Sequence, residues 1–379
     1  MGLRESTPRL RLRRTTVAGV LAMSILGLAA MGAKAGSTAT PAQRAASAGT
    51  AAATKLGKAT VPSGITVGLN QIVGAFPQAQ RIQNEFTTAA KAIGWKVVVC
   101  DAQGDPTKMA NCETSLLNQG VKAVFSIGEE SSLIAAGLQQ AKAKGIPTFN
   151  IGGQVSPSPL FTGNYGPNES KAGAVLGAYV VKTIGPAGGK VLLSDYPALY
   201  GKLRTGGLKN AIKGTNFKIA ATTQPDFANV VVSTRQQVTS MVQQNPDAKV
   251  YWLSVEAAIQ PAAQAMSAAT GGKHYPDAPL VVTFHADLST LDLIRQGLVD
   301  AVSENQYPAS AWVAVDSAAE YFARKQATPS PGYQVGGFPI YSYPIITKQN
   351  LPPAGKYVPL TNDYFVFFKT KWKKEFGIK

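Results

Sequence analysis

Residues 65–151 decide the fold, and they open with the apolar run Ile65-Thr66-Val67-Gly68-Leu69-Asn70 and close with Thr148-Phe149-Asn150-Ile151. Two similar runs, 96–101 and 121–127, lie between them. The stretches that separate the runs carry apolar residues at the spacing of a half-buried helix. The pattern predicts four strands joined by three helices. Because the runs are continuously apolar and the connections are long, the strands are expected to be parallel and buried on both faces.

Polar residues follow these predicted strands at the point where each one ends. In open sheets of this type, ligands bind beyond the carboxyl ends of the strands. The functional surface is therefore expected near residues 71–76, 101–105, 128–131 and 150–154.

The strand and helix rhythm resumes after a turn-rich joint at Asn164-Tyr165-Gly166-Pro167. Further strands are predicted at 190–195, 217–224, 250–254, 280–285 and 299–304, with helices between them. Two successive sheets of this kind predict an α/β fold with two doubly wound lobes. A cleft is expected where the strand ends of one lobe face those of the other.

The positive charge of the chain could attract anions or a membrane surface, but it indicates a solvated basic surface better than a nucleic-acid partner. The formal net charge is +16, and residues 1–35 contribute a surplus of five, which leaves about +11 on the rest. This excess is spread along the chain, without a basic run or a base-stacking motif, so no nucleic-acid binding is expected.

The N-terminus is typical of a signal peptide over residues 1–35. Arg11, Arg13 and Arg14 precede an apolar stretch at 17–31, and Ala33-Lys34-Ala35 supplies small residues for cleavage. The apolar stretch is short for a membrane anchor. Residues 36–61 are rich in Ala, Thr, Ser and Gly and are expected to form a flexible linker. The rest of the protein is then expected in the periplasm or outside the cell.

The chain has two cysteines, Cys100 and Cys112, at the end of a predicted strand and on the following helix. In an exported protein a disulfide between them is favoured over two free thiols. A metal site is not expected, because two thiolates without a nearby histidine are too few ligands.

Six short motifs carry a family resemblance. They are Gly104-Asp105-Pro106, Gly120-Val121-Lys122-Ala123-Val124, Gly145-Ile146-Pro147, Gln224-Pro225-Asp226-Phe227, Asn245-Pro246-Asp247 and Arg295-Gln296-Gly297. In this order and spacing, residues 62–350 resemble the ribose-binding-protein type of periplasmic substrate-binding protein (type I), the receptor subunit of sugar ABC importers.

The resemblance implies two discontinuous lobes joined by a three-strand hinge near 164–167, 305–307 and 340–342. Lobe 1 would comprise residues 62–166 and 307–341, and lobe 2 residues 167–306 and 342–379. It also implies a monomer that closes over a small sugar, polyol or modified sugar and presents it to a membrane permease of an ABC transporter.

The resemblance places ligand contacts on specific residues. Phe76 and Phe227 match stacking aromatic residues, and Gln306 matches a hinge glutamine. Glu130, with its neighbour Glu129, matches an acidic position, and either Lys202 or Arg204 a hydroxyl-binding arginine. The expected set is completed by Gln71, Asn164, Ser254, Glu256, His285 and Asp287.

Two departures from the family pattern bear on the ligand. His285 replaces an acidic residue, with Asp287 two positions on, and Ser254-Val255 replaces an asparagine–aspartate pair, leaving Glu256. The missing groups would grip sugar hydroxyls through charge-assisted hydrogen bonds. An ordinary pentose or hexose is therefore disfavoured, and His285 introduces a possible pH dependence of binding between about pH 5 and 8.

Other functions fit the sequence less well. No nucleophile motif or dinucleotide fingerprint is present, so neither an enzyme nor a cofactor is expected. A LacI-like repressor would need a helix-turn-helix before Ile65, and none is evident. A receptor for a sugar-like signal, such as an autoinducer or chemoattractant, stays open as the alternative to uptake.

Overall fold

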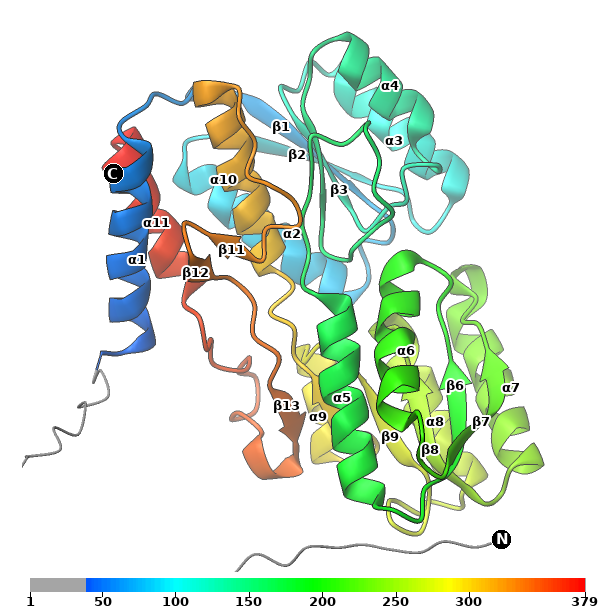
Figure 1. Cartoon of the computed structure of the whole chain (residues 1–379). Helices are drawn as coiled ribbons and strands as arrows, with labels where there is room; N and C mark the ends of the chain where they lie inside the picture. Colours follow the sequence, from blue (N-terminus) through cyan, green and yellow to red (C-terminus); the bar gives the residue numbers. More distant parts are fainter. Residues whose placement is uncertain (1–38, 379) are drawn as a thin grey trace, which may run out of the picture. The chain divides into compact units, whose positions relative to one another are not determined.

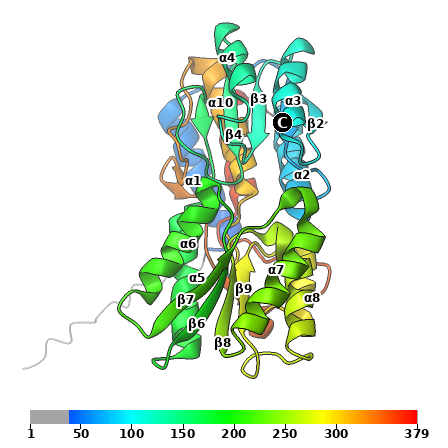
Figure 2. The same ribbon diagram turned by 90° about the vertical axis from the view of Figure 1, so that its right-hand side faces the viewer.

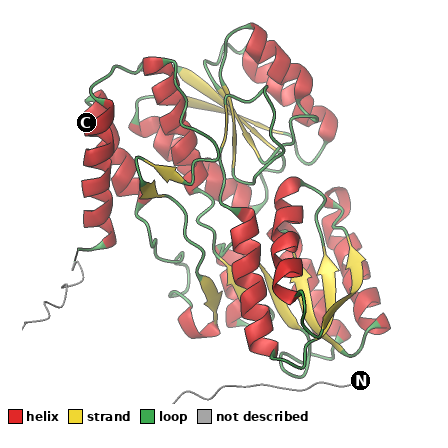
Figure 3. Ribbon diagram, in the orientation of Figure 1, coloured by secondary structure: helices red, strands yellow, loops and turns green. Residues whose placement is uncertain are grey.

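The computed structural model describes residues 39–378 (Figure 1). The predicted signal peptide over residues 1–35 lies outside the described residues. Two separate sheets, each with helices against it, make up most of the described chain (Figure 3).

The first lobe is built on a five-stranded parallel sheet in the order β2-β1-β3-β4-β5. Helices α2 and α10 pack together on one side of this sheet, and α3 and α4 pack together on the other (Figure 1). The elements are β1 Thr66–Gln71, α2 Pro77–Ala92, β2 Lys96–Asp101, α3 Pro106–Asn118, β3 Val124–Ile127, α4 Ala135–Ala143, β4 Thr148–Ile151, β5 Gly163–Asn164 and α10 Ala309–Arg324.

The second lobe is built on a six-stranded sheet in the order β13-β10-β9-β8-β6-β7, in which the edge strand β13 runs antiparallel. Figure 2 shows β9, β8, β6 and β7 side by side. The strands are β6 Gly189–Ser194, β7 Phe217–Thr223, β8 Ala248–Leu253, β9 Leu280–Phe284, β10 Ala301–Ser303 and β13 Ile345–Thr347. The helices are α5 Glu169–Ile184, α6 Leu199–Ile212, α7 Val230–Gln244, α8 Ile259–Ala269 and α9 Leu288–Arg295, with short 3₁₀ turns at Phe227–Asn229, Glu256–Ala258 and Lys348–Asn350.

Glycine sets the separation of α5 and α6. A Cβ on Gly173 of α5 would lie 2.1 Å from the backbone oxygen of Arg204 on α6, which no side chain tolerates. The close approach that glycine permits brings Glu169, at the start of α5, to the guanidinium of Arg204.

The predicted α/β fold with two doubly wound lobes is confirmed, but the chain passes between the lobes more often than expected. It crosses between β5 and α5, between β10 and α10, and between the β11–β12 hairpin (Gln334–Val335 and Phe338–Pro339) and β13. A fourth passage follows β13, because the C-terminal helix α11 (Tyr364–Phe376) returns to the core of the first lobe.

The assignment of residues 342–379 to the second lobe is therefore wrong for α11. Phe367, Phe368 and Trp372 are buried in the first core, and the rings of Trp372 and Trp312 of α10 stack at 5.4 Å. The ammonium of Lys371, also buried, lies 2.7 Å from Asp316 of α10. Aromatic packing and a buried ion pair thus hold the C-terminus in the first lobe.

The prediction of a flexible linker at residues 36–61 is also wrong for residues 41–56, and residues 36–38 lie outside the described residues. Residues Pro41–Leu56 form helix α1, which is capped by Thr40 and buries Ala45 and Ala52 against the first lobe. Alanine is the best helix former. A Cβ on Gly49 would lie 2.5 Å from the backbone oxygen of Phe367, so the small residues of α1 allow it to lie directly against α11 (Figure 1).

A disulfide joins Cys100 at the end of β2 to Cys112 on α3, with Cα atoms 5.5 Å apart. Between them, the carboxylate of Asp105 accepts hydrogen bonds from the backbone N–H groups of Thr107 and Lys108 and caps α3. The loop between β2 and α3 is therefore held at both ends. Over residues 39–378, no helix is long and apolar enough to cross a membrane.

The first lobe buries an acidic side chain, Glu113 of α3, beneath β1 and β3. Its Oε2 accepts hydrogen bonds from Asn70 Nδ2 at 3.1 Å and Ser126 Oγ at 3.3 Å. Burial raises the pKa of Glu113 to about 7, although both hydrogen bonds favour the ionised form.

Replacing Glu113 with glutamine is expected to flatten the fall in stability between about pH 5 and 7. Because the folded pKa exceeds that of the unfolded chain, the native state binds the extra proton in this range. The protonated Glu113 contributes its full stabilisation below the pKa that the residue has in the unfolded chain. This contribution is lost as the pH rises through the pKa of the folded protein. The wild type should lose up to about 1.4 kcal/mol per pH unit relative to Glu113→Gln. Urea unfolding at several pH values measures the difference, with the exposed Asp277→Asn as control. Parallel curves for wild type and Glu113→Gln would contradict the expectation.

Candidate functional site

A cavity lies between the two lobes, at the carboxyl ends of their strands. Its walls come from the segments that follow β1, β3 and β4 in the first lobe and β7, β8, β9 and β10 in the second, together with α2 and α6. The space open to the centres of water molecules is about 80 Å³, enough for several waters or one small ligand. The lining residues are Ile72, Val73, Phe76, Gln78, Ala79, Ile82, Ile127, Gly128, Gly153, Tyr200, Arg204, Phe227, Val255, Glu256, Ala257, His285 and Tyr307.

Aromatic rings from both lobes form one wall of the cavity. Phe76, just before α2, meets Phe227 of the second lobe edge to face, with ring centroids 5.7 Å apart. Tyr196 stacks on Phe227 at 4.5 Å and on Tyr200 at 5.6 Å. Such rings cover the apolar face of a ligand at a small entropic cost.

The guanidinium of Arg204 is buried, and its side chain is only 1% exposed. Nε and Nη2 donate to the two carboxylate oxygens of Glu169 at 2.7 and 3.0 Å, a bidentate pair. Nη1 donates to the backbone oxygen of Ser254 at 2.9 Å and to Glu256 Oε2 at 3.3 Å, and Nη2 reaches His285 Nε2 at 3.0 Å. The arginine thereby joins α5, α6 and the ends of β8 and β9.

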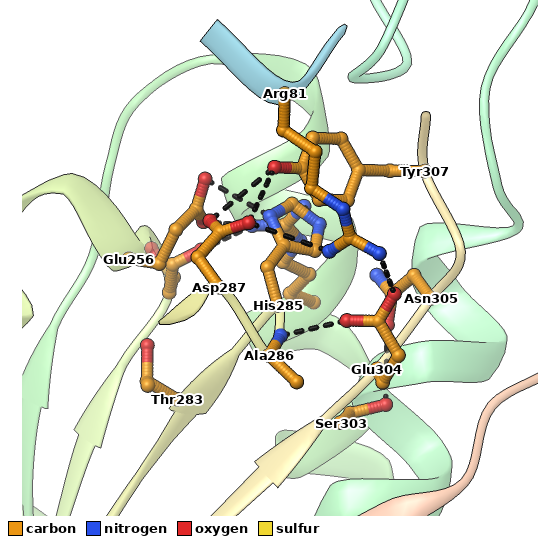
Figure 4. Close-up of polar contacts among 12 residues, drawn as sticks. Arg81, Glu256, Thr283, His285, Ala286, Asp287, Ser303, Glu304, Asn305 and Tyr307 are labelled. Carbon is orange, nitrogen blue, oxygen red and sulfur yellow. Dashed lines mark hydrogen bonds and ion pairs between the residues drawn. The ribbon is translucent and has the colours of Figure 1, made fainter. Parts of the chain in front are cut away.

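His285 stands at the end of β9 with a φ of 60°, a strained conformation for a residue other than glycine. Its Nε2 faces an N–H of Arg204, so this nitrogen is the acceptor and the proton sits on Nδ1, which lies 2.9 Å from Glu256 Oε1. Its ring stacks on Tyr307 with centroids 3.9 Å apart (Figure 4). The imidazole is thus held on three sides.

The two carboxylates around His285 have different electrostatics. Burial opposes the ionisation of Glu256, but His285 and Arg204 outweigh it and lower its pKa to about 2. Burial raises the pKa of Asp287, although Arg81 and His285 favour its charge. Glu256 is therefore a fixed negative charge on the cavity wall.

Arg81 of α2 bridges the lobes next to the cavity (Figure 4). Its Nη1 and Nη2 lie 3.3 Å from Asp287 Oδ1 and Glu304 Oε1, both in the second lobe. The guanidinium also lies over the rings of Tyr307 and Tyr357, at 5.4 and 4.5 Å from their centroids. A second contact between the lobes is the hydrogen bond from the backbone N–H of Leu199 to Glu130 Oε1 at 3.2 Å.

The structure brings five of the sequence-predicted residues to the cavity: Phe76, Arg204, Phe227, Glu256 and His285. Two more lie outside the lining and accept hydrogen bonds from residues of the cavity wall. Ser254 accepts a hydrogen bond from Arg204 through its backbone oxygen, and Asp287 accepts one from the hydroxyl of Tyr307 at 3.0 Å.

The remaining six expected contacts lie outside the lining, and five of them are engaged elsewhere or deeply buried. Lys202 is exposed because α6 turns it away from the face that carries Arg204. Glu129 is fully buried. Burial raises its pKa, and the negative charge of Glu113 raises it further. The others have protein partners: Gln71 with Gln83, Glu130 with Ser156 and Leu199, Asn164 with Asn150 and Val155, and Gln306 with Ser342.

Three residues of the site escaped the sequence analysis: Arg81, Tyr200 and Tyr307. Tyr200 lies one helical turn before Arg204, and Tyr307 directly follows Gln306, so both were adjacent to positions already singled out. Arg81 lies one turn into α2 and carried no signal of its own.

Comparisons with known proteins agree with this architecture. The family model described as "Periplasmic binding protein domain" matches residues 70–326. The D-apiose import binding protein of Paraburkholderia graminis is 26% identical over 70% of this chain and 81% of its own length. The ribose import binding protein RbsB of Bacillus subtilis is 24% identical over 43% of this chain and 53% of its own. The Caulobacter myo-inositol binding protein, solved with myo-inositol, superposes with a TM-score of 0.66 at 21% identity, covering 79% of this chain and 98% of its own.

The family model covers more than half of the chain, which therefore belongs to the periplasmic binding protein domain family. Members of this family are receptors that bind solutes outside the cytoplasm and carry out no catalysis. The protein is accordingly a solute-binding receptor for import and not an enzyme, as the sequence had indicated.

Proposed function

We propose that this receptor binds a small sugar, polyol or modified sugar in the cavity between its lobes and delivers it to an ABC permease for uptake. The observation that carries the proposal is the cavity at the facing strand ends, with the Phe76–Phe227 pair above it and Arg204, Glu256 and His285 beside it. An aromatic cover and a charged edge suit a ligand with one apolar and one hydroxylated face.

The proposed mechanism is a hinge motion in which ligand contacts favour the closed state. The joints are those indicated by the sequence, near 164–167, 305–307 and 340–342. The hydroxyl of Ser342 donates to Gln306 Oε1 at 2.6 Å and ties two of these joints together. The lobe boundaries follow from the joints, with α1 and α11 added to the first lobe.

The proposal also covers the export of the receptor from the cytoplasm. Residues 1–35 direct export and are removed, and the mature chain acts as a monomer that meets its permease at the membrane. The names of relatives such as the D-apiose import binding protein support uptake over signalling.

Thermal-shift measurements on the exported chain without residues 1–35 test this function. A sugar or polyol at about 100 times its dissociation constant should stabilise the protein by about 2.7 kcal/mol, because it binds only the native state. Phe76→Ala should weaken the same ligand by about tenfold or more, since the ring is half of the aromatic cover.

Lys202→Ala is the matched control and should leave binding unchanged, because this side chain lies outside the cavity. Stabilisation by nucleotides or amino acids with none by any sugar or polyol would sink the proposal. Unchanged affinity in Phe76→Ala would remove the cavity as the binding site.

A further inference from the structure

The charged side chains of the cavity are already paired with one another. Arg204 has five N–H donors, and each faces a protein acceptor: two on Glu169, and one each on Ser254, Glu256 and His285. No N–H of this guanidinium is left for a ligand hydroxyl.

The neighbouring groups are equally committed. Nε2 of His285 is engaged by Arg204, and the buried Nδ1 lies 2.9 Å from Glu256 Oε1, a close approach without good hydrogen-bond geometry. The hydroxyl of Tyr307 donates to Asp287. Glu256 differs, because a carboxylate has about four acceptor sites, and its contacts with His285, Arg204 and its own backbone N–H leave room for a ligand hydroxyl.

The rest of the cavity wall is largely apolar. Ile72, Ile82 and Ile127 line it from the first lobe, and Val255 and Ala257 from the second. With the rings of Phe76 and Phe227, these side chains meet most of the surface of any ligand inside. Gln78 of α2 also lines the cavity, and its amide can donate to or accept from a ligand hydroxyl.

This distribution of polar groups penalises a ligand that is hydroxylated all round. A buried hydroxyl without a hydrogen-bond partner loses its contacts with water and gains none. A methyl or methylene group at the same place fills apolar space and is favoured. Glu256 and Gln78 can serve hydroxyls of the ligand, and the rest of its surface meets mostly carbon.

Resting on the proposed function, we propose that this cavity selects deoxy sugars over their fully hydroxylated counterparts. A hydroxyl of one edge donates to Glu256, and the deoxygenated carbon packs among the isoleucines and the phenylalanine pair.

Isothermal titration with matched pairs tests the preference: D-fucose against D-galactose, L-rhamnose against L-mannose, and 2-deoxy-D-ribose against D-ribose. The pair that contains the tightest-binding sugar decides. Its deoxy member should bind about tenfold tighter or more, because it does not bury a hydroxyl that has no hydrogen-bond partner.

Equal or tighter binding of the hydroxylated member overturns the inference and leaves the proposed function intact. Binding confined to fully hydroxylated sugars or polyols outside these pairs does the same. Binding of no sugar or polyol at all overturns the proposed function, and the inference with it.

A variant of the cavity wall gives an independent readout. Val255→Thr places a hydroxyl on the wall without changing the volume, so the affinity ratio between deoxy and hydroxylated members should move toward the hydroxylated one. Val255→Ala removes volume without adding a polar group and should leave the direction of the preference unchanged. A ratio that is the same in wild type and Val255→Thr overturns the view that the small number of free polar groups sets it.

Discussion

Replacing Arg204 with methionine is expected to destabilise the protein by about 3–5 kcal/mol and to abolish solute binding. Methionine keeps much of the volume, but it leaves the buried carboxylates of Glu169 and Glu256 without their cation. Glu169 also accepts a hydrogen bond from Asn305 at 3.2 Å, so the loss extends to a segment that crosses between the lobes. Urea unfolding and isothermal titration with the tightest-binding sugar measure the two effects.

A second substitution separates the two effects of Arg204. Adding Glu169→Gln to Arg204→Met should recover part of the stability, because a neutral amide costs less to bury than an unpaired carboxylate. Binding should stay absent, since Glu256 and His285 remain without the guanidinium that fixes them. Lys202→Met, on the exposed face of the same helix, should change neither quantity. Arg204→Met with wild-type stability would show that the network contributes little.

Local sequence patterns were enough to predict the two doubly wound lobes. They were not enough to predict where the helices at the two ends of the chain pack. The apolar runs of β1, β3 and β4 carry their own signal, because a strand buried on both faces is continuously apolar. The run at β2 is equally apolar, but this strand lies at the sheet edge and is only partly buried, so the expectation of burial on both faces is wrong for it. Helix α1 carries none: its alanines look like a linker until α11, more than 300 residues later, provides a surface for Ala45 and Ala52. Composition describes a segment alone, whereas its state depends on a partner far along the chain.

The same division explains which site residues the sequence revealed. Phe227, Glu256 and His285 lie within four residues of the ends of β7, β8 and β9, and the carboxyl edge of a parallel sheet fixes where such residues lie. Lys202 and Arg204 were left as alternatives, and only the packing of α5 on α6 decides between them. Arg81 could not be found in this way, because its partners Asp287 and Glu304 are 206 and 223 residues further on.

Arg81 is the charged link between the lobes, and its contacts depend on the lobes being together. Asp287 and Glu304 belong to the second lobe, and Arg81 comes from α2 of the first. When the lobes separate, water replaces the guanidinium around both carboxylates. The ion pairs therefore stabilise the closed state relative to the open one and add little to the free energy of unfolding either lobe.

Replacing Arg81 with alanine is accordingly expected to weaken sugar binding by about 30- to 100-fold, or roughly 2–3 kcal/mol. The variant populates the closed state less, and the apparent dissociation constant rises by the same factor as that population falls. Small-angle X-ray scattering should show a larger radius of gyration for the ligand-free variant than for the wild type. Isothermal titration measures the affinity.

Two matched variants identify the cause. Arg81→Lys keeps the charge but lacks the planar fork that reaches both carboxylates, so it should fall between the wild type and Arg81→Ala. Lys91→Ala, an exposed residue on the same helix, should bind as the wild type does. A wild-type radius of gyration and affinity in Arg81→Ala would mean that the ion pairs do not control closure. The Phe76–Phe227 contact, the hydrogen bond from Leu199 to Glu130 and the bound solute would then have to hold the lobes together.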